Sequence, residues 1–362
     1  MKTRIAALLG LVALLATQAT ATEFKSKAEE ISLTGRVQVQ WSHSTVDGDP
    51  SNEFLIRRAR ATLKIKINDW WSGVLQPDFA GGELSLKDAY VKLKPHDNFS
   101  LTMGQFKRRF DLFELTSSTR ILVIERDGHI GRQKIPSLSR FTEANEYADR
   151  DIGAFVSAHD SKKIFSLDAG ITNGAGSDTK AEVSEKAYQG RLTLRPLEAL
   201  PLRIMGGVSL RPYESEFAGT DSAGVDYASA FEGSVEWGTF EAGIHLQAGF
   251  VIGDNVKGVE LSEATTFDIT DPPSFFAFQG ILTYKHPLAD NTWFESFEPV
   301  VRVGYGDPDT DVGDNGGLLI TPGINVFTKT RNRLSVNADI FTPRADGADT
   351  EVGVKIQSWL YW

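Results

Sequence analysis

The chain has 362 residues, a formal net charge of −10 and no cysteine. The absence of cysteine excludes the small scaffolds of exported proteins that depend on disulfide bonds. An acidic chain is also a poor candidate for a protein that binds nucleic acid, so we expect no nucleic-acid partner.

The first 21 residues have the organisation of a secretory signal peptide. Lys2 and Arg4 precede an apolar run over residues 5–16, and Ala19-Thr20-Ala21 provides a small-residue cleavage pattern. The run is shorter than the roughly 20 residues of a membrane-spanning helix. We predict a signal peptide over 1–21 and a single mature domain over 22–362, either soluble after export or crossing a membrane as a barrel.

Residues 57–67 alternate between two kinds of side chain. Side chains on a β-strand point alternately to opposite faces. One face carries Arg58, Arg60, Thr62, Lys64 and Lys66. The other carries Ala59, Ala61, Leu63, Ile65 and Ile67. A membrane β-barrel suits this pattern because the apolar face contacts lipid and the charged face lines an aqueous lumen. We therefore expect Arg58 and Arg60 to face water.

The same alternation recurs along nearly the whole mature chain. We predict strands near residues 36–41, 57–67, 71–79, 88–93, 99–107, 152–158, 165–172, 191–195, 202–211, 231–237, 241–250, 276–284, 301–305, 320–327, 334–340 and 352–362. The strand at 99–107 has mixed parity, so its faces stay unassigned. The pattern predicts an all-β fold, a 16-stranded antiparallel up-and-down transmembrane β-barrel.

The connectors between these strands alternate between long and short. Such a rhythm is typical of a barrel with short periplasmic turns and longer outer loops. The longest connector runs from Arg108 to Asp149. Interfacial aromatic girdles would explain five tryptophans, namely Trp70, Trp71, Trp237, Trp293 and Trp359.

Two basic walls are expected on the lumen face, in a barrel wide enough for an aqueous channel. The first comprises Arg36, Arg58, Arg60, Lys64 and Lys66. The second comprises Arg191, Arg195, Arg203 and Arg211, and Arg302 lies on a later strand. Guanidinium groups match phosphate oxygens, so such walls favour anions. Alternatively, the cations pair with lumen carboxylates and leave only mild selectivity; the candidates are Asp78, Asp88, Asp168, Glu232, Glu236 and Glu241.

Six short motifs, in this order, resemble the phosphate-selective porin O/P family. They are Arg-Arg-Ala-Arg at 57–60, Lys-Asp-Ala-Tyr-Val at 87–91, Gly-Gln-Phe-Lys at 104–107, Glu-Leu-Thr-Ser-Ser at 114–118, Ile-Glu-Arg at 124–126 and Arg-Asp-Ile-Gly at 150–153. The resemblance is densest over about 33–174. It implies a homotrimeric outer-membrane channel, in contact with the lipid bilayer and lipopolysaccharide, whose long third loop folds inward.

By this resemblance, residues 108–149 would form the constriction of the channel. The loop contributes cations that include Arg120 and Arg126. By similarity, the narrow zone would combine Arg36, Arg58, Arg60, Asp88, Lys107, Ser117 and Ser118. The solute would be inorganic phosphate or another small anion.

Three functions remain open from the sequence. The first is a channel that passes small anions, phosphate or related oxyanions, by passive diffusion. The second is a general diffusion porin with little selectivity, and the third is an exported soluble β-protein that binds a ligand. An enzyme is not expected, because the histidines lack metal-ligand spacing and no serine-nucleophile or phosphate-loop motif is present. We expect no cofactor.

Overall fold

The computed structural model describes residues 26–46, 52–131, 133–177, 184–197, 200–216, 223–259, 271–289 and 291–362. The predicted signal peptide, residues 1–21, lies outside the described residues. Within the described ranges, no helix is long and apolar enough to cross a membrane.

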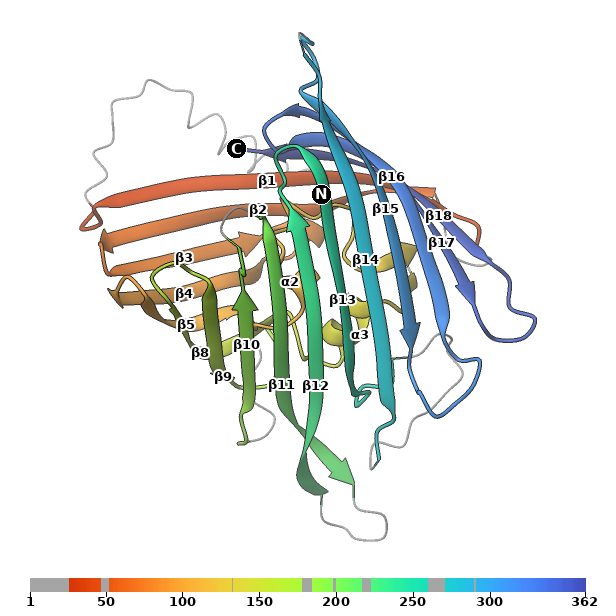
Figure 1. The fold of residues 1–362 in the computed structure, drawn as a ribbon, viewed down its shortest axis with the longest axis horizontal. Helices are drawn as coiled ribbons and strands as arrows, with labels where there is room; N and C mark the ends of the chain where they lie inside the picture. The colour runs from red at the N-terminus through yellow and green to blue at the C-terminus, as the bar shows by residue number, and fades with distance from the viewer. Residues whose placement is uncertain are drawn as a thin grey trace, which may run out of the picture.

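Sixteen antiparallel strands close into a barrel, with β1 paired to β18 (Figure 1). The barrel strands are β1 Glu30–Ser44, β2 Asn52–Asn68, β3 Trp71–Asp78, β4 Ser85–His96, β5 Phe99–Lys107, β8 Arg150–His159, β9 Phe165–Thr172, β10 Ala187–Leu194, β11 Leu202–Glu216, β12 Ala223–Gly238, β13 Gly243–Asp254, β14 Ser274–Pro287, β15 Ser296–Asp307, β16 Gly317–Lys329, β17 Asn332–Pro343 and β18 Glu351–Tyr361. The predicted 16-stranded antiparallel barrel is confirmed.

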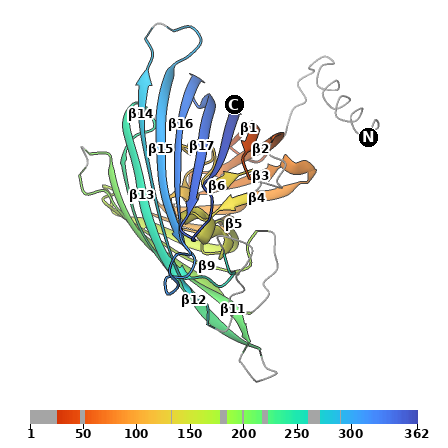
Figure 2. The same ribbon diagram turned by 90° about the vertical axis from the view of Figure 1, so that its right-hand side faces the viewer.

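The connector from Arg108 to Asp149 contains regular structure of its own. Its elements are α2 Leu112–Leu115, β6 Gly128–Ile130, β7 Gln133–Ile135 and α3 Leu138–Ala144; a short 3₁₀ turn, η1 Ala80–Gly82, lies elsewhere, between β3 and β4. The hairpin of β6 and β7 is separate from the barrel sheet, and β6 lies beside β17 and β18 (Figure 2).

The strand faces follow the predicted alternation over most of the barrel. In β1, Gln38 is 1% exposed on the polar face, whereas its neighbour Val39 is 43% exposed on the apolar face. In β18, Lys355 and Gln357 are buried, whereas Ile356 is exposed. Because successive side chains of a closed barrel point in and out, the polar face is the inner one.

A β-bulge at Arg57 reverses this parity within β2. Gln38 of β1 pairs with Arg58 and the next residue, Val39, pairs with Ile56, so Arg57 has no partner across the ladder. A bulge turns its extra residue away from the regular direction and exchanges the faces beyond it. Outward side chains are therefore even-numbered before the bulge, as at the exposed Ile56, and odd-numbered after it, as at the exposed Ile67.

Strand β5 owes its mixed parity to two residues. Phe106 is an apolar side chain on the inner face, where its ring packs edge to face on Phe155 at 4.6 Å. Gln105, next to it, donates its side-chain amide to the carbonyl oxygens of Leu86 and Lys87 at 2.7 and 3.0 Å. Those carbonyls lie at a second bulge, where the register of β3 and β4 shifts.

The expected position of Trp359 in an interfacial girdle is wrong. Its side chain is 5% exposed and lies on the inner parity of β18, where the guanidinium of Arg333 stacks over the ring at 3.8 Å. The outer parity of that strand carries Leu360 and Trp362, which are both exposed. Alternation within the strand excludes Trp359 from the face that these residues occupy.

Replacement of Leu63 with Arg should lower the free energy of unfolding by roughly 2 to 4 kcal/mol if the site lies near the membrane midplane. Leu63 pairs with Leu33 and Leu75, both exposed on the outer face, so the new charge would enter lipid. Urea unfolding in lipid vesicles measures the change. Lys64→Gln on the opposite parity is the matched control and should shift stability by less than about 0.5 kcal/mol; equal effects of the two variants would contradict the assigned faces.

Candidate functional site

Residues of the 108–149 segment bond to polar side chains on several strands of the wall. On β16, Asn325 donates its side-chain amide to the Leu122 carbonyl at 2.8 Å. On β17, the side-chain oxygen of Asn337 accepts from the Ile124 amide at 2.6 Å. On β11, Arg211 donates to the Asn145 carbonyl oxygen at 2.9 Å. The segment thus lies against the inner face, as the positions of α2 and α3 in Figure 1 also indicate.

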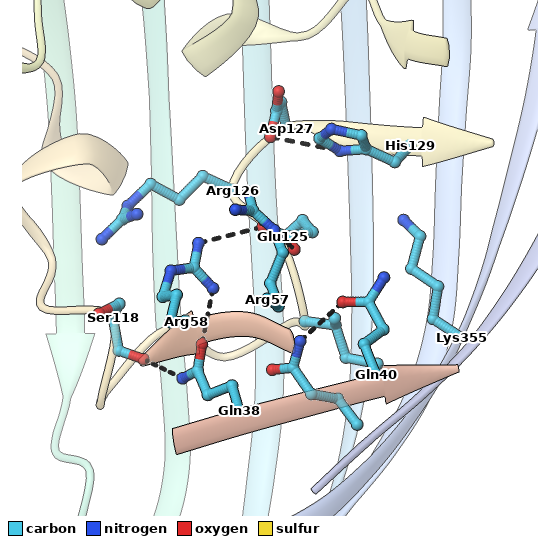
Figure 3. A network of polar contacts seen from close by, with 12 residues as sticks. Gln38, Gln40, Arg57, Arg58, Ser118, Glu125, Arg126, Asp127, His129 and Lys355 are labelled. Atoms are coloured by element: carbon cyan, nitrogen blue, oxygen red, sulfur yellow. Dashed lines mark hydrogen bonds and ion pairs between the residues drawn. The ribbon is translucent and has the colours of Figure 1, made fainter. Parts of the chain in front are cut away.

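A buried carboxylate, Glu125, fixes the segment to β2 (Figure 3). Its Oε2 accepts from Arg57 Nη2 at 3.0 Å and from Arg58 Nη2 at 3.1 Å, and its Oε1 pairs with the Nε of Arg57. Arg58 also donates to the Gln38 side-chain oxygen at 2.8 Å. Burial opposes ionisation of Glu125, but the two arginines outweigh it, Arg57 most strongly, and hold its pKa well below the usual range.

The bulge in β2 makes this double contact possible. Adjacent residues of a regular strand point to opposite faces, yet both Arg57 and Arg58 reach Glu125. The expectation that Arg58 faces water is wrong, because the segment covers it and leaves its side chain only 3% exposed.

Arg36 of β1 occupies a different electrostatic environment. Its Nη1 donates to the Ser118 hydroxyl at 2.7 Å, while Gln38 donates to the Ser118 carbonyl at 3.2 Å. The charges of Arg58 and Arg126 repel Arg36. Among the described residues, no carboxylate lies within ion-pair distance of its guanidinium.

Lys107 and Arg126 share one buried carboxylate. Lys107 lies 3.1 Å from Glu114 Oε2, and Arg126 lies 3.6 Å from Glu114 Oε1. Arg126 also donates to the Phe113 carbonyl at 2.8 Å. Two carboxylates, Glu114 and Glu125, therefore serve four cations on this side of the lumen.

Two further ion pairs border Arg36. Arg60, which pairs directly with Arg36 in the β1–β2 register, contacts Asp78 Oδ2 at 2.6 Å. Asp88 contacts Arg150 at 2.8 Å. The structure thus gathers Arg36, Arg58, Arg60, Asp88, Lys107, Ser118 and Arg126 in one region. We call it the β1–β2 cluster.

The other predicted residues lie outside the β1–β2 cluster. Lys66 contacts Asp69 at 2.7 Å at a tight turn, and Lys64 is exposed further along the same strand. Ser117 shares a hydroxyl contact with Thr119 at 3.1 Å. Arg120 stacks on Phe240, which lies between β12 and β13, on the opposite side of the barrel from β2.

The second wall is largely paired with carboxylates. Its contacts are Arg191 with Glu232 at 3.2 Å, Arg203 with Glu236, and Arg211 with Glu146 at 2.8 Å. Arg195 bonds instead to neutral acceptors, the Lys163 carbonyl and the Ser166 hydroxyl. On β15, Arg302 contacts Asp339 at 2.7 Å. The pairing that the sequence left open as an alternative is therefore present on this wall.

Four residues that lie in or beside the contacts of the β1–β2 cluster were not among the predicted site residues. They are Arg57, Glu114, Glu125 and Arg150. All four lie inside the motifs that carried the family resemblance, at 57–60, 114–118, 124–126 and 150–153. The motifs were a usable signal, but the prediction overlooked two carboxylates within them, Glu114 and Glu125, and two arginines, Arg57 and Arg150.

A third buried carboxylate, Asp111, organises the start of the segment. It accepts from the Phe113 amide at 2.8 Å, from Thr142 Oγ1 at 2.8 Å and from Ser139 Oγ at 3.1 Å. These bonds cap α2 and tie it to α3. Burial, with a smaller contribution from the Glu114 charge, raises the pKa of Asp111 to about 6.

The closed barrel, its apolar outer face and its polar inner face define a transmembrane β-barrel of the porin class. The sequence model of the family described as phosphate-selective porin O and P matches residues 31–222, more than half of the chain. The chain belongs to this family.

Solved outer-membrane proteins share the fold at low sequence identity. The channel DcaP of Acinetobacter baumannii is 15% identical, with a TM-score of 0.61 over 93% of this chain and 99% of that one. OprB of Pseudomonas putida is 12% identical, with a TM-score of 0.60 over 94% and 96%. OmpT of Vibrio cholerae, in its trimer form, is 13% identical, with a TM-score of 0.58 over 92% and 99%. No curated protein matches the chain significantly.

Replacement of Glu125 with Ala should release the segment from β2. Removing one partner of a buried ion pair typically costs about 3 to 5 kcal/mol, because the remaining charge is left uncompensated. Hydrogen exchange and limited proteolysis of residues 117–130 should both accelerate. Glu143→Ala, which removes a more exposed carboxylate 3.8 Å from Lys134, is the control and should have little effect. Unchanged protection in the Glu125 variant would contradict the anchoring role.

Packing of the segment should weaken as pH rises from about 4 to 6. Because the packed state raises the Asp111 pKa to about 6, it binds this proton more tightly than a detached segment, whose Asp has a pKa of about 3.9. Hydrogen exchange at residues 111–115, corrected for intrinsic rates, should therefore be slower at pH 5 than at pH 7. Asp111→Asn should reduce this difference, and faster corrected exchange at pH 5 would contradict the assignment.

Proposed function

We propose that this porin passes small anions, phosphate or related oxyanions, by passive diffusion, and that the β1–β2 cluster is its selective zone. The observation that carries the proposal is the position of Arg36. Its guanidinium is held by a neutral hydroxyl, is surrounded by other cations and makes no ion pair within the described residues. An anion beside it would relieve the repulsion from Arg58, Arg126 and Arg150, which Asp88 offsets only in part.

The geometry suits weak, repeated binding of an oxyanion. Guanidinium offers several donors in one plane, and phosphate oxygens accept them in pairs. Ser118 and Gln38 add neutral polar groups next to Arg36. Asp88 and Asp78, held by Arg150 and Arg60, would disfavour a tightly bound dianion and so assist release.

The 108–149 segment serves as the constriction in this proposal. Its bonds to β2, β11, β16 and β17 span the inner face, and the β1–β2 cluster lies where residues 114–126 meet the wall. A narrow zone with an excess of unpaired cation selects anions more effectively than a wide charged tube, because the interaction is less screened.

Export, assembly and surroundings complete the proposal. A signal peptide over residues 1–21 would direct export, and the mature chain would assemble as a homotrimer in the outer membrane, in contact with lipopolysaccharide. Family membership supports this assembly, and one of the similar structures is described as a trimer.

A general diffusion porin is the second candidate. The observation that favours it is the pairing of the second wall, where Arg191, Arg203 and Arg211 each contact a carboxylate. Selectivity would then be mild, because paired charges leave little net field in the lumen. The exported soluble protein does not fit a closed barrel of the porin family.

Replacement of Arg36 with Gln should weaken both anion preference and phosphate block of the chloride current. A lost hydrogen bond from a charged group corresponds to roughly tenfold or more in half-blocking concentration. Reversal potentials in a KCl gradient and phosphate titration in planar bilayers measure the two effects. Arg344→Gln, which removes an exposed loop cation paired with Asp314, is the matched control. Cation preference of the unmodified channel would favour the second candidate.

A further inference from the structure

A group of cavities surrounds Arg120 and Phe240, away from the β1–β2 cluster. Their volumes are about 660, 320 and 210 Å³, and both residues line all three. The largest lies within the roughly 300 to 1,000 Å³ that small-molecule sites occupy. Phosphate transport through the β1–β2 cluster does not account for these cavities.

Arg120 offers guanidinium donors that no described side chain uses. Its backbone amide donates to the Ser117 carbonyl at 2.7 Å, which fixes the turn that presents it. Its guanidinium carbon lies 5.3 Å from the centre of the Phe240 ring. Among the described residues, the side chain makes no ion pair and no hydrogen bond. A cation stacked on an aromatic ring keeps its in-plane donors available to an anion.

Arg195 and Arg203 complete a cationic side of the largest cavity. Arg195 bonds to neutral acceptors alone, at 3.2 and 3.3 Å. Arg203 pairs with Glu236, which also contacts His245 at 2.9 Å. The charges of Arg195 and Arg120 repel Arg203. Four cations line this cavity, Arg120, Lys162, Arg195 and Arg203, against two carboxylates, Glu236 and Glu241. The cavity therefore carries an excess of positive charge.

The same cavity has an apolar side. Ile164 and Phe240 line it. The Phe240 ring packs edge to face on His245 at 4.3 Å, so its position is supported from behind. Inorganic oxyanions gain nothing from apolar walls, because their whole surface is polar. An aromatic carboxylate uses both sides, since its ring contacts the apolar wall while its charge meets the arginines.

We propose that this cavity binds small aromatic carboxylates of the benzoate type. The carboxylate bonds to Arg120 and Arg195, and the ring lies against Phe240 and Ile164. The site is separate from the β1–β2 cluster, so the channel handles organic anions at one place and inorganic oxyanions at another. The proposal of an aromatic carboxylate site does not depend on phosphate selectivity at Arg36.

Block of the chloride current in planar bilayers tests the proposal, with benzoate, acetate and phosphate as probes on the purified full-length channel. Benzoate should block at a lower concentration than acetate, because acetate lacks the ring. Phe240→Ala should raise the half-blocking concentration of benzoate roughly two- to tenfold and leave that of phosphate unchanged. Phe240→Leu, which keeps an apolar side chain, and Arg120→Gln provide independent variants should the alanine variant fail to assemble.

Two controls separate this site from the β1–β2 cluster. Arg36→Gln should change phosphate block and leave benzoate block unchanged, so failure of phosphate selectivity and failure of the aromatic site are distinguishable. Arg344→Gln should change neither. Equal potency of benzoate and acetate, or unchanged benzoate block in the Arg120→Gln channel, would overturn the proposal.

Discussion

The ion pairs of Glu125 with Arg57 and Arg58 are the interaction on which the interior of this barrel depends. The wall alone encloses a tube whose inner face carries many charges. Glu125 brings residues of the 108–149 segment onto that face and neutralises a guanidinium that the segment itself buries. Without this carboxylate, burying Arg58 would be too costly for the segment to remain there. The position of the segment in the lumen therefore depends on the charge balance between Glu125 and the two arginines, Arg57 and Arg58.

The inner cations divide into two groups with different physical roles. Arginines bonded to carboxylates, such as Arg60, Arg191 and Arg302, hold neighbouring strands and the segment in position. Cations bonded to hydroxyl, carbonyl or aromatic groups, such as Arg36 and Arg120, are the ones that we propose interact with a passing solute. The number of lumen cations in the sequence therefore overstates the field that an ion meets. The acceptor that each cation contacts is the informative quantity.

The sequence predicted the wall well, because one rule governs it. Alternation of polar and apolar side chains located the strands, and closure into 16 strands followed. The rule fails where a specific long-range contact outweighs it. The bulge at Arg57 and the inward ring of Phe106 are set by partners distant in the sequence, Glu125 and Phe155. Trp359 was assigned by residue type, although its parity placed it inside.

The candidate site was predictable in its members and not in its contacts. The motifs contain Arg58, Arg60, Lys107 and Ser118, the first basic wall adds Arg36, and the structure brings these residues together. Which arginine is covered and which is left without a carboxylate depends on how the segment folds against the wall. No periodicity along the chain encodes that choice, because α2, α3 and the β6–β7 hairpin are short elements held by long-range bonds.

The single extra residue in β2 also constrains how this gene can vary. Loss of one codon at position 57 would restore an unbroken pleat, and Phe54 and Ile56 would then turn from the hydrocarbon into the water of the lumen. Gain of one codon nearby would turn Arg58 from the lumen toward the hydrocarbon. Substitutions here exchange one side chain, whereas insertions and deletions exchange half a strand. This stretch should therefore keep a fixed length among relatives even where its residues differ.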